Sequence, residues 1–153
     1  MKVVLLSEGA MVPKRVNEFA AGYDLFTPKD VLVNPGRNMI LLDISVELDP
    51  QTEGEVRPCS GFSIKGMKGY SLNDPNTEKR FDADVIIGTV DEDYRGIVGV
   101  IIKSFEKEPF LIKHKEKIAQ LVVKKYVGTP FEIVSELTTT DRGTKGFGQL
   151  EHQ

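Results

Sequence analysis

The stretch Gly88–Gly96 carries residue types that could do chemistry, because it places three carboxylates, a tyrosine and an arginine on one short connection. Apolar runs over 84–87 and 97–102 flank it and predict a hairpin. Aspartate, with a reference pKa of about 4, is ionised at neutral pH, as a general base must be. Glycines at both ends let backbone approach a ligand closely. The alternative is an acidic solvated turn, because loops are usually polar for solvation alone.

The overall composition is that of one globular domain. The chain has 153 residues, of which 40% are hydrophobic and 28% charged, enough for a core of ordinary size. A net charge of -3 gives no basic surface for a nucleic-acid polymer, although a free nucleotide needs only local positive charge. Cys59 is the one cysteine, so no intramolecular disulfide can form, which fits a reducing compartment.

The start of the chain and its apolar runs argue against export and membrane insertion. Residues 3–6 are apolar but the run is too short for a signal peptide, and no apolar run approaches the roughly 20 residues that span a bilayer. We therefore expect a soluble, intracellular protein, in the cytoplasm, the nucleus or a host cell, with no membrane partner.

Short strand patterns separated by turn signals dominate the chain. No apolar period of 3.6 residues lasts beyond about three turns, so we expect an all-β barrel or double sheet. Asn34-Pro35-Gly36 suits a type II turn, and the polar residues 63–83 are interpreted as a long excursion. Strands are expected over 2–6, 20–27, 31–33, 39–48 (one or two strands), 55–58, 84–87, 97–102, 110–112 and 118–126.

Five segments together resemble, in order and chemistry, the five motifs of the trimeric dUTP diphosphatases (dUTPases). Any one segment alone is weak, and the most specific is Gly-Thr-Val-Asp-Glu-Asp-Tyr-Arg-Gly at 88–96. The resemblance runs from about residue 20 to residue 148. The segments are Ala21-Gly22-Tyr23-Asp24-Leu25, Arg57-Pro58-Cys59-Ser60-Gly61, Gly88–Gly96, Lys117-Ile118-Ala119-Gln120-Leu121 and Arg142-Gly143-Thr144-Lys145-Gly146-Phe147-Gly148.

The resemblance implies a fold and an assembly. It implies an all-β, distorted jelly-roll-like barrel as the catalytic domain, over 1–134, and a flexible C-terminal tail over 135–153 that carries the fifth motif. It also implies a homotrimer with shared active sites, in which the hairpin, the phosphate-binding motifs and the tail come from different subunits. The implied activity is hydrolysis of dUTP to dUMP and pyrophosphate with Mg²⁺.

The resemblance also assigns catalytic roles. Asp91 would orient and deprotonate the water that attacks the α-phosphorus, and Gln120 would help to hold that water. Asp24 would support the water shell of Mg²⁺, an ion that often binds through substrate phosphates and few protein carboxylates. The plainer alternatives are a turn-capping carboxylate for Asp91 and a structural strand acid for Asp24.

The remaining assignments concern substrate binding. Tyr94 would pack against the deoxyribose where a ribose 2′-hydroxyl would clash, and backbone around Gly88, Thr89, Val90 and Gly99 would read the uracil edge. A half-buried strand tyrosine and simple hairpin tightness are the respective alternatives. The phosphate contacts and the closing tail are assigned to Ser60, Gly61, Arg142, Phe147 and Gly148.

The chain departs from the family pattern at its second motif. The family usually has an arginine between the proline and the serine, where this chain has Cys59. The sequence predicts that Arg57, Lys65 or Lys68 replaces that phosphate contact. Cys59 itself has no visible partner base and is interpreted as a small filler residue.

Two other departures concern a loop and the tail. Residues 69–80 look like extra chain, either a surface loop, a lid or a protein-binding arm. The tail lacks the small hydroxyl residues that usually follow its Phe-Gly, and Lys145 is expected to compensate electrostatically.

Two other functions stay open from the sequence. A dCTP deaminase shares the implied fold, but the Asp-Glu-Asp-Tyr-Arg-Gly hairpin favours the diphosphatase. A nucleotide-gated binding or regulatory protein with little turnover is consistent with Cys59, the extra loop and the altered tail. His114 and His152 make no metal-ligand spacing with Cys59 and are interpreted as surface residues.

Overall fold

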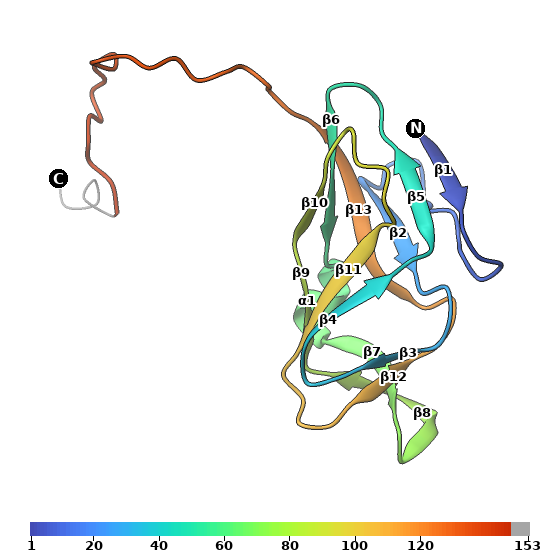
Figure 1. Cartoon of the computed structure of the whole chain (residues 1–153). Coiled ribbons are helices and arrows are strands. Elements are labelled where there is room, and N and C mark those ends of the chain that lie inside the picture. Colours follow the sequence, from blue (N-terminus) through green and yellow to red (C-terminus); the bar gives the residue numbers. More distant parts are fainter. Residues whose placement is uncertain (148–153) are drawn as a thin grey trace.

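The computed structural model of the chain describes residues 1–147, which are mostly β-structure. Figure 1 shows an elongated body built from short sheets, with the C-terminal residues leaving one end as an extended arm. The last strand ends at Lys125, and no helix or strand follows it within the described residues. No helix among residues 1–147 is long and apolar enough to cross a membrane.

A four-stranded antiparallel sheet forms the frame for the chemistry-bearing segments. Its register places Val90 opposite Gly54, and Gln120 opposite both Arg57 and Asp24. In spatial order its strands are β10 (Gly88–Val90), β6 (Thr52–Arg57), β13 (Lys117–Lys125) and β2 (Gly22–Phe26).

Three further sheets complete the body, and the four together are jelly-roll-like rather than closed into one continuous barrel. One pairs β1 (Lys2–Leu5) with β5 (Ile44–Glu47). The second has the order β4 (Gly36–Leu41), β11 (Gly99–Ser104), β9 (Ala83–Ile86). The third has the order β3 (Val31–Val33), β12 (Phe110–Ile112), β7 (Met67–Ser71), β8 (Asp74–Phe81). The all-β, jelly-roll-like fold class is thereby confirmed.

One apolar core joins the sheets. Leu25, Ile102, Phe110 and Ile118 come from four different strands and are each at most 1% exposed. Burial of side chains of this size stabilises the fold by about 1.5–3 kcal/mol each. Within the described residues no buried polar side-chain atom lacks a hydrogen-bond partner.

The structure confirms most predicted strands and corrects one prediction. Residues 63–83 are not an irregular excursion but the end of helix α1 (Ser60–Lys65) followed by the β7–β8 hairpin. The prediction was wrong because β8 is an edge strand that exposes polar side chains on almost every residue, so the apolar alternation of a half-buried strand is missing. The type II turn is supported by Gly36, whose φ is +82°.

The β7–β8 hairpin is anchored at its base. The Phe81 ring stacks on the buried Phe110 ring with centroids 4.3 Å apart. Gly66, just before β7, has φ 74° and ψ 176°, a conformation that is essentially restricted to glycine. A Cβ at Gly66 would also lie 2.3 Å from the Phe81 carbonyl oxygen. The close approach of backbone at this point therefore requires glycine.

Substitution of this glycine should cost more stability than substitution of a glycine under backbone strain alone. We expect Gly66→Ala to lower the free energy of unfolding by about 3 kcal/mol or more, because backbone strain and a steric clash add. Gly36→Ala is the matched control, since its Cβ would meet nothing within 4 Å. It should cost about 1–2 kcal/mol in urea unfolding at equal protein concentration. Equal losses in the two variants would show that the Phe81 contact is unimportant.

Candidate active site

Five of the predicted substrate-binding residues line one pocket, which we call the hairpin pocket. It has a volume of about 430 Å³, and β9, β10, β11 and the turn after β10 contribute to it. Its other lining side chains are apolar, so it suits an apolar ligand body whose polar edge is read by backbone groups. The five residues are Gly88, Thr89, Val90, Tyr94 and Gly99.

Tyr94 is held in the hairpin pocket by its own turn, with 44% of the residue exposed. Its hydroxyl donates to the Ile97 carbonyl at 3.1 Å, and its backbone N–H donates to the Asp91 carbonyl at 3.1 Å. Gly96 makes room for the ring, because a Cβ there would lie 2.4 Å from Tyr94 Oη. The ring position therefore depends on glycine at this position.

The turn that carries Asp91 is fixed by two charged neighbours. Arg95 Nη1 donates to two carbonyls of the same turn, at 2.8 and 3.0 Å. Glu92 Oε2 accepts the backbone N–H of Gln51 at 3.0 Å and the hydroxyl of Tyr126, which ties the turn to the start of β6 and the end of β13. Asp91 itself is exposed, so its carboxylate is open to water or a ligand.

A second pocket, which we call the basic pocket, lies where β6 ends and α1 begins. It has a volume of about 400 Å³, and it brings together Ser60 and Gly61, the predicted phosphate contacts. Three cationic side chains and one carboxylate line it, so its balance of charge is positive. The lining residues are Cys59, Ser60, Gly61, Phe62, Lys68, Arg80, Glu116 and Lys117.

Asp24 and Gln120 are register partners on adjacent strands next to the basic pocket. Asp24 Oδ2 lies 3.4 Å from Lys117 Nζ, and Gln120 Nε2 donates to the Pro58 carbonyl at 2.9 Å. Burial raises the pKa of the Cys59 thiol, and the nearby Asp24 acts in the same direction while Lys117 opposes it. The thiol is therefore protonated at pH 7, which fits a filler residue better than a nucleophile.

Strand β6 keeps Asp91 away from Gln120 within one chain. Asp91 follows Val90, which pairs with Gly54, whereas Gln120 pairs with Arg57. The two rows lie roughly 10 Å apart along β6, and β10 and β13 are two strand spacings of about 4.8 Å apart. One water that contacts both side chains would need them within about 6 Å of each other.

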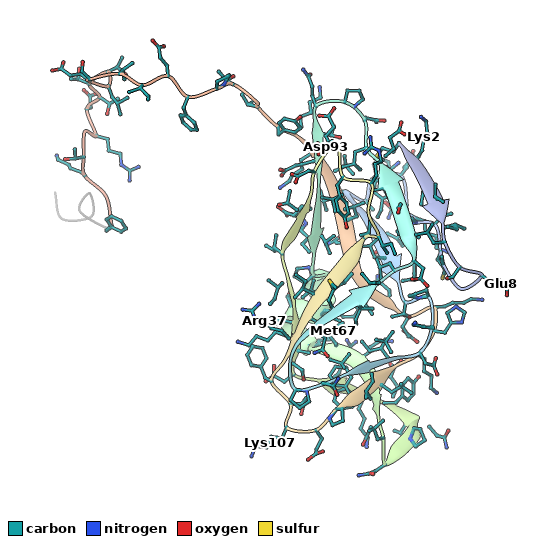
Figure 2. All side chains as sticks on the ribbon, in the orientation of Figure 1. Lys2, Glu8, Arg37, Met67, Asp93 and Lys107 are labelled. Carbon is teal, nitrogen blue, oxygen red and sulfur yellow. The ribbon has the colours of Figure 1, made fainter. Side chains whose placement is uncertain are left out.

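Arg142 and Phe147, the predicted tail residues that the structure describes, line neither pocket of their own chain. Arg142 Nε donates to the Lys145 carbonyl at 2.9 Å, and Phe147 is fully exposed. Both belong to the arm that extends away from the body in Figure 1 and Figure 2. Gly148 lies outside the described residues.

Two residues that contribute to the candidate site were not predicted from the sequence. Arg80 lines the basic pocket, and Tyr126 holds the Asp91 turn through Glu92. The only available signal for Arg80 was a basic pair at the end of a polar stretch. Tyr126 and Glu92 are 34 residues apart, and no pattern in the sequence joins them.

Comparison with known proteins gives a consistent result along nearly the whole chain. A model of the dUTPase family matches residues 8–72 and 78–150, and the unmatched residues 73–77 lie at the tip of the β7–β8 hairpin, inside the 69–80 stretch predicted to be extra. The deoxyuridine 5'-triphosphate nucleotidohydrolase of Clostridium tetani is 37% identical over 149 residues, which cover 97% of this chain and 94% of the relative.

Solved structures agree with this match. The G164S mutant of Staphylococcus bacteriophage 80alpha dUTPase with dUpNHpp superposes with a TM-score of 0.79 at 26% identity, over 97% of this chain and 96% of that one. A second 80alpha dUTPase structure, with dUPNHPP, has a TM-score of 0.78 at 27% identity and the same coverage. That phage dUTPase is said to control transfer of virulence genes by a proto-oncogenic G protein-like mechanism.

The Tyr126–Glu92 contact predicts a pH dependence of stability. The hydrogen bond to Glu92 raises the pKa of Tyr126 above its ordinary value of 10.0 in the folded chain. A folded pKa above the unfolded one contributes stability that is complete below pH 10 and is lost as the pH rises through the folded pKa. Tyr126→Phe should therefore be less stable than the wild type at pH 8, and the difference should shrink at pH 11. Urea unfolding at both pH values measures it, and a difference that is the same at both would contradict the assignment.

Proposed function

The chain belongs to the dUTPase family, and we propose that it hydrolyses dUTP to dUMP and pyrophosphate. The observation that carries the proposal is the hairpin pocket, where five residues expected to bind the nucleoside line one cavity next to an exposed aspartate. The basic pocket supplies the second requirement of such an enzyme, which is positive charge for a triphosphate.

The hairpin pocket would select the nucleoside. Tyr94 would pack its ring against the deoxyribose, where a ribose 2′-hydroxyl has no room. The backbone of Gly88, Thr89, Val90 and Gly99 would read the uracil edge. This use of backbone agrees with a pocket whose walls are otherwise apolar.

The basic pocket would receive the phosphates. Ser60 offers a hydroxyl donor, and Gly61 a backbone N–H. Among the replacements predicted for the missing arginine, Lys68 lines the pocket, whereas Arg57 does not and instead lies 3.4 Å from Glu55. Lys65 is not among the lining residues either. The placement favours Lys68 of the three.

Magnesium fits this arrangement as an ion carried largely by the substrate. Residues 1–147 hold no group of three or more His, Cys, Asp and Glu arranged for a metal, while Asp24 is a single half-buried carboxylate next to the basic pocket. Mg²⁺ binds in this way through phosphates, waters and few carboxylates, and Asp24 would hold it through water. When bound, the ion neutralises charge on the phosphates.

Asp91 would act as the general base. It would take a proton from water as the water oxygen bonds to the α-phosphorus and the bond to the bridging oxygen breaks, releasing pyrophosphate. Gln120 would hold the same water. Because β6 separates Asp91 and Gln120 within one chain, the two must come from different copies.

A homotrimer with shared active sites answers this requirement. Two exposed apolar features fit contacts between copies. One is the strip of Met39, Leu41 and Ile101 on paired strands β4 and β11, which also forms part of the wall of the hairpin pocket. The other is the arm, in which Phe131 and Ile133 are fully exposed. In the assembly the arm would bring Arg142 and Phe147 over the nucleotide of a neighbouring site.

A regulatory role is the second candidate, favoured by the description of the 80alpha dUTPase and by the extra hairpin tip. In this case the 69–80 stretch would bind a protein when nucleotide is present. Capture of a partner that depends on dUTP but is unchanged in Asp91→Asn would support it. Release of ammonia from dCTP would instead indicate a deaminase.

Replacement of Asp91, the proposed general base, is the first functional test. We expect wild-type protein with Mg²⁺ to release pyrophosphate from dUTP and to leave dTTP, dCTP and UTP essentially unchanged. Asp91→Asn should lower turnover by about 10²–10⁴-fold, the usual contribution of a positioned base, with little change in nucleotide affinity. Tight binding of dUTP by a wild type that releases no pyrophosphate would reject the enzyme and favour the regulatory role.

Mixing two inactive variants tests whether sites are shared. Asp91→Asn and Gln120→Ala should each have low activity alone. After the two are unfolded together and refolded at equal amounts, roughly a quarter of the sites should combine an intact Asp91 with an intact Gln120, because each site draws on two chains at random. Recovered activity is measured as pyrophosphate release. If mixing restores nothing above the sum of the parents, both groups come from one chain.

A further inference from the structure

The three cations of the basic pocket differ in how their charge is already compensated. Lys68 Nζ lies 3.0 Å from Glu78 Oε1, and Lys117 Nζ lies 3.4 Å from Asp24 Oδ2. Among residues 1–147, Arg80 has no carboxylate within ion-pair distance. Arg80 is therefore the cation of this pocket with the most charge left for an anionic ligand.

Arg80 is also held in position. Its Nη1 donates to the Gly66 carbonyl at 3.0 Å, which leaves most of its five N–H donors unused. It pairs directly with Lys68 across the hairpin, so both side chains point to the same side of the sheet. The next residue, Phe81, faces the opposite side and stacks on the buried Phe110. The base of the hairpin thus fixes the backbone from which Arg80 extends.

Guanidinium groups suit phosphates because their planar donors can contact two oxygens at once. Ser60 also lines the pocket and offers a hydroxyl donor, and Cys59 contributes no charge to it. Glu116 is the one carboxylate in the lining, so a bound anion would meet a net positive wall.

We propose that Arg80 binds the terminal phosphates of the nucleotide in the basic pocket, so that the β7–β8 hairpin supplies this chain with a guanidinium for phosphate binding in addition to Lys68. The inference deepens the proposed function and rests on it for the identity of the nucleotide. Arg80 is a binding residue that does not touch the reacting phosphorus. Its effect should therefore grow with the length of the phosphate chain.

Calorimetric titration of the full chain with three probes tests the proposal. The probes are the non-hydrolysable imido analogue of dUTP, dUMP and inorganic tripolyphosphate, each with Mg²⁺. Arg80→Ala should lower the affinity for the dUTP analogue and for tripolyphosphate by about ten- to a hundredfold, as expected for loss of one charge-assisted contact. It should change the affinity for dUMP by less than about twofold. Arg80→Lys should recover part of the loss, since it keeps the charge without the planar fork.

Lys79→Ala is the matched control on the same hairpin. Lys79 is exposed, pairs with Asp74 at 3.3 Å and does not line the pocket, so its loss should change all three affinities by less than about twofold. The proposal is overturned if Arg80→Ala keeps its affinity for both polyphosphates, or if dUMP affinity falls equally.

The proposed function and this inference fail in different ways. A wild type that binds tripolyphosphate through Arg80 but releases no pyrophosphate from dUTP would remove the function and keep the binding site. A wild type that hydrolyses dUTP with the same KM as Arg80→Ala would keep the function and remove the role of Arg80.

Discussion

The backbone hydrogen bonds that hold β6 between β10 and β13 are the constraint on which the rest of the structure depends. They fix Val90 opposite Gly54, in the middle of β6, and Gln120 opposite Arg57, at its end, so the two partners lie three residues or roughly 10 Å apart along the strand, on opposite sides of it. A rigid strand cannot bring these two positions together. In the proposed function, the hairpin pocket and the basic pocket of one chain would be two half-sites, and chemistry that needs both would require a second copy.

Charge is distributed over the half-sites in a way that suits a triphosphate. The hairpin end carries carboxylates, of which Glu92 holds the turn through hydrogen bonds and Asp91 is exposed. The other end collects cations from three separate segments, and the β7–β8 hairpin contributes two of them. The anchoring of that hairpin by Phe81 and Gly66 links a feature of the core to the placement of charge at the surface.

Much of the fold and of the candidate site could be predicted from the sequence, and the exceptions have physical causes. Strands with one buried face can be predicted because apolar and polar residues alternate along them. The 88–96 stretch can be predicted as part of a site because it combines glycines, carboxylates, a tyrosine and an arginine. Helix α1 is only six residues long, too short for a period of 3.6 to appear. Strand β8 is polar because its edge faces solvent. Arg80 and Tyr126 act through contacts distant in sequence, which no local pattern contains.

The central claim is that one copy of the chain cannot complete an active site. The most direct test is to sediment the active enzyme through a dUTP-containing solution in an analytical ultracentrifuge and to follow where in the cell pyrophosphate is released. The account predicts that turnover travels with an oligomer and that dilution to the 17.0 kDa monomer abolishes it. Turnover of dUTP that sediments with the monomer would contradict the account.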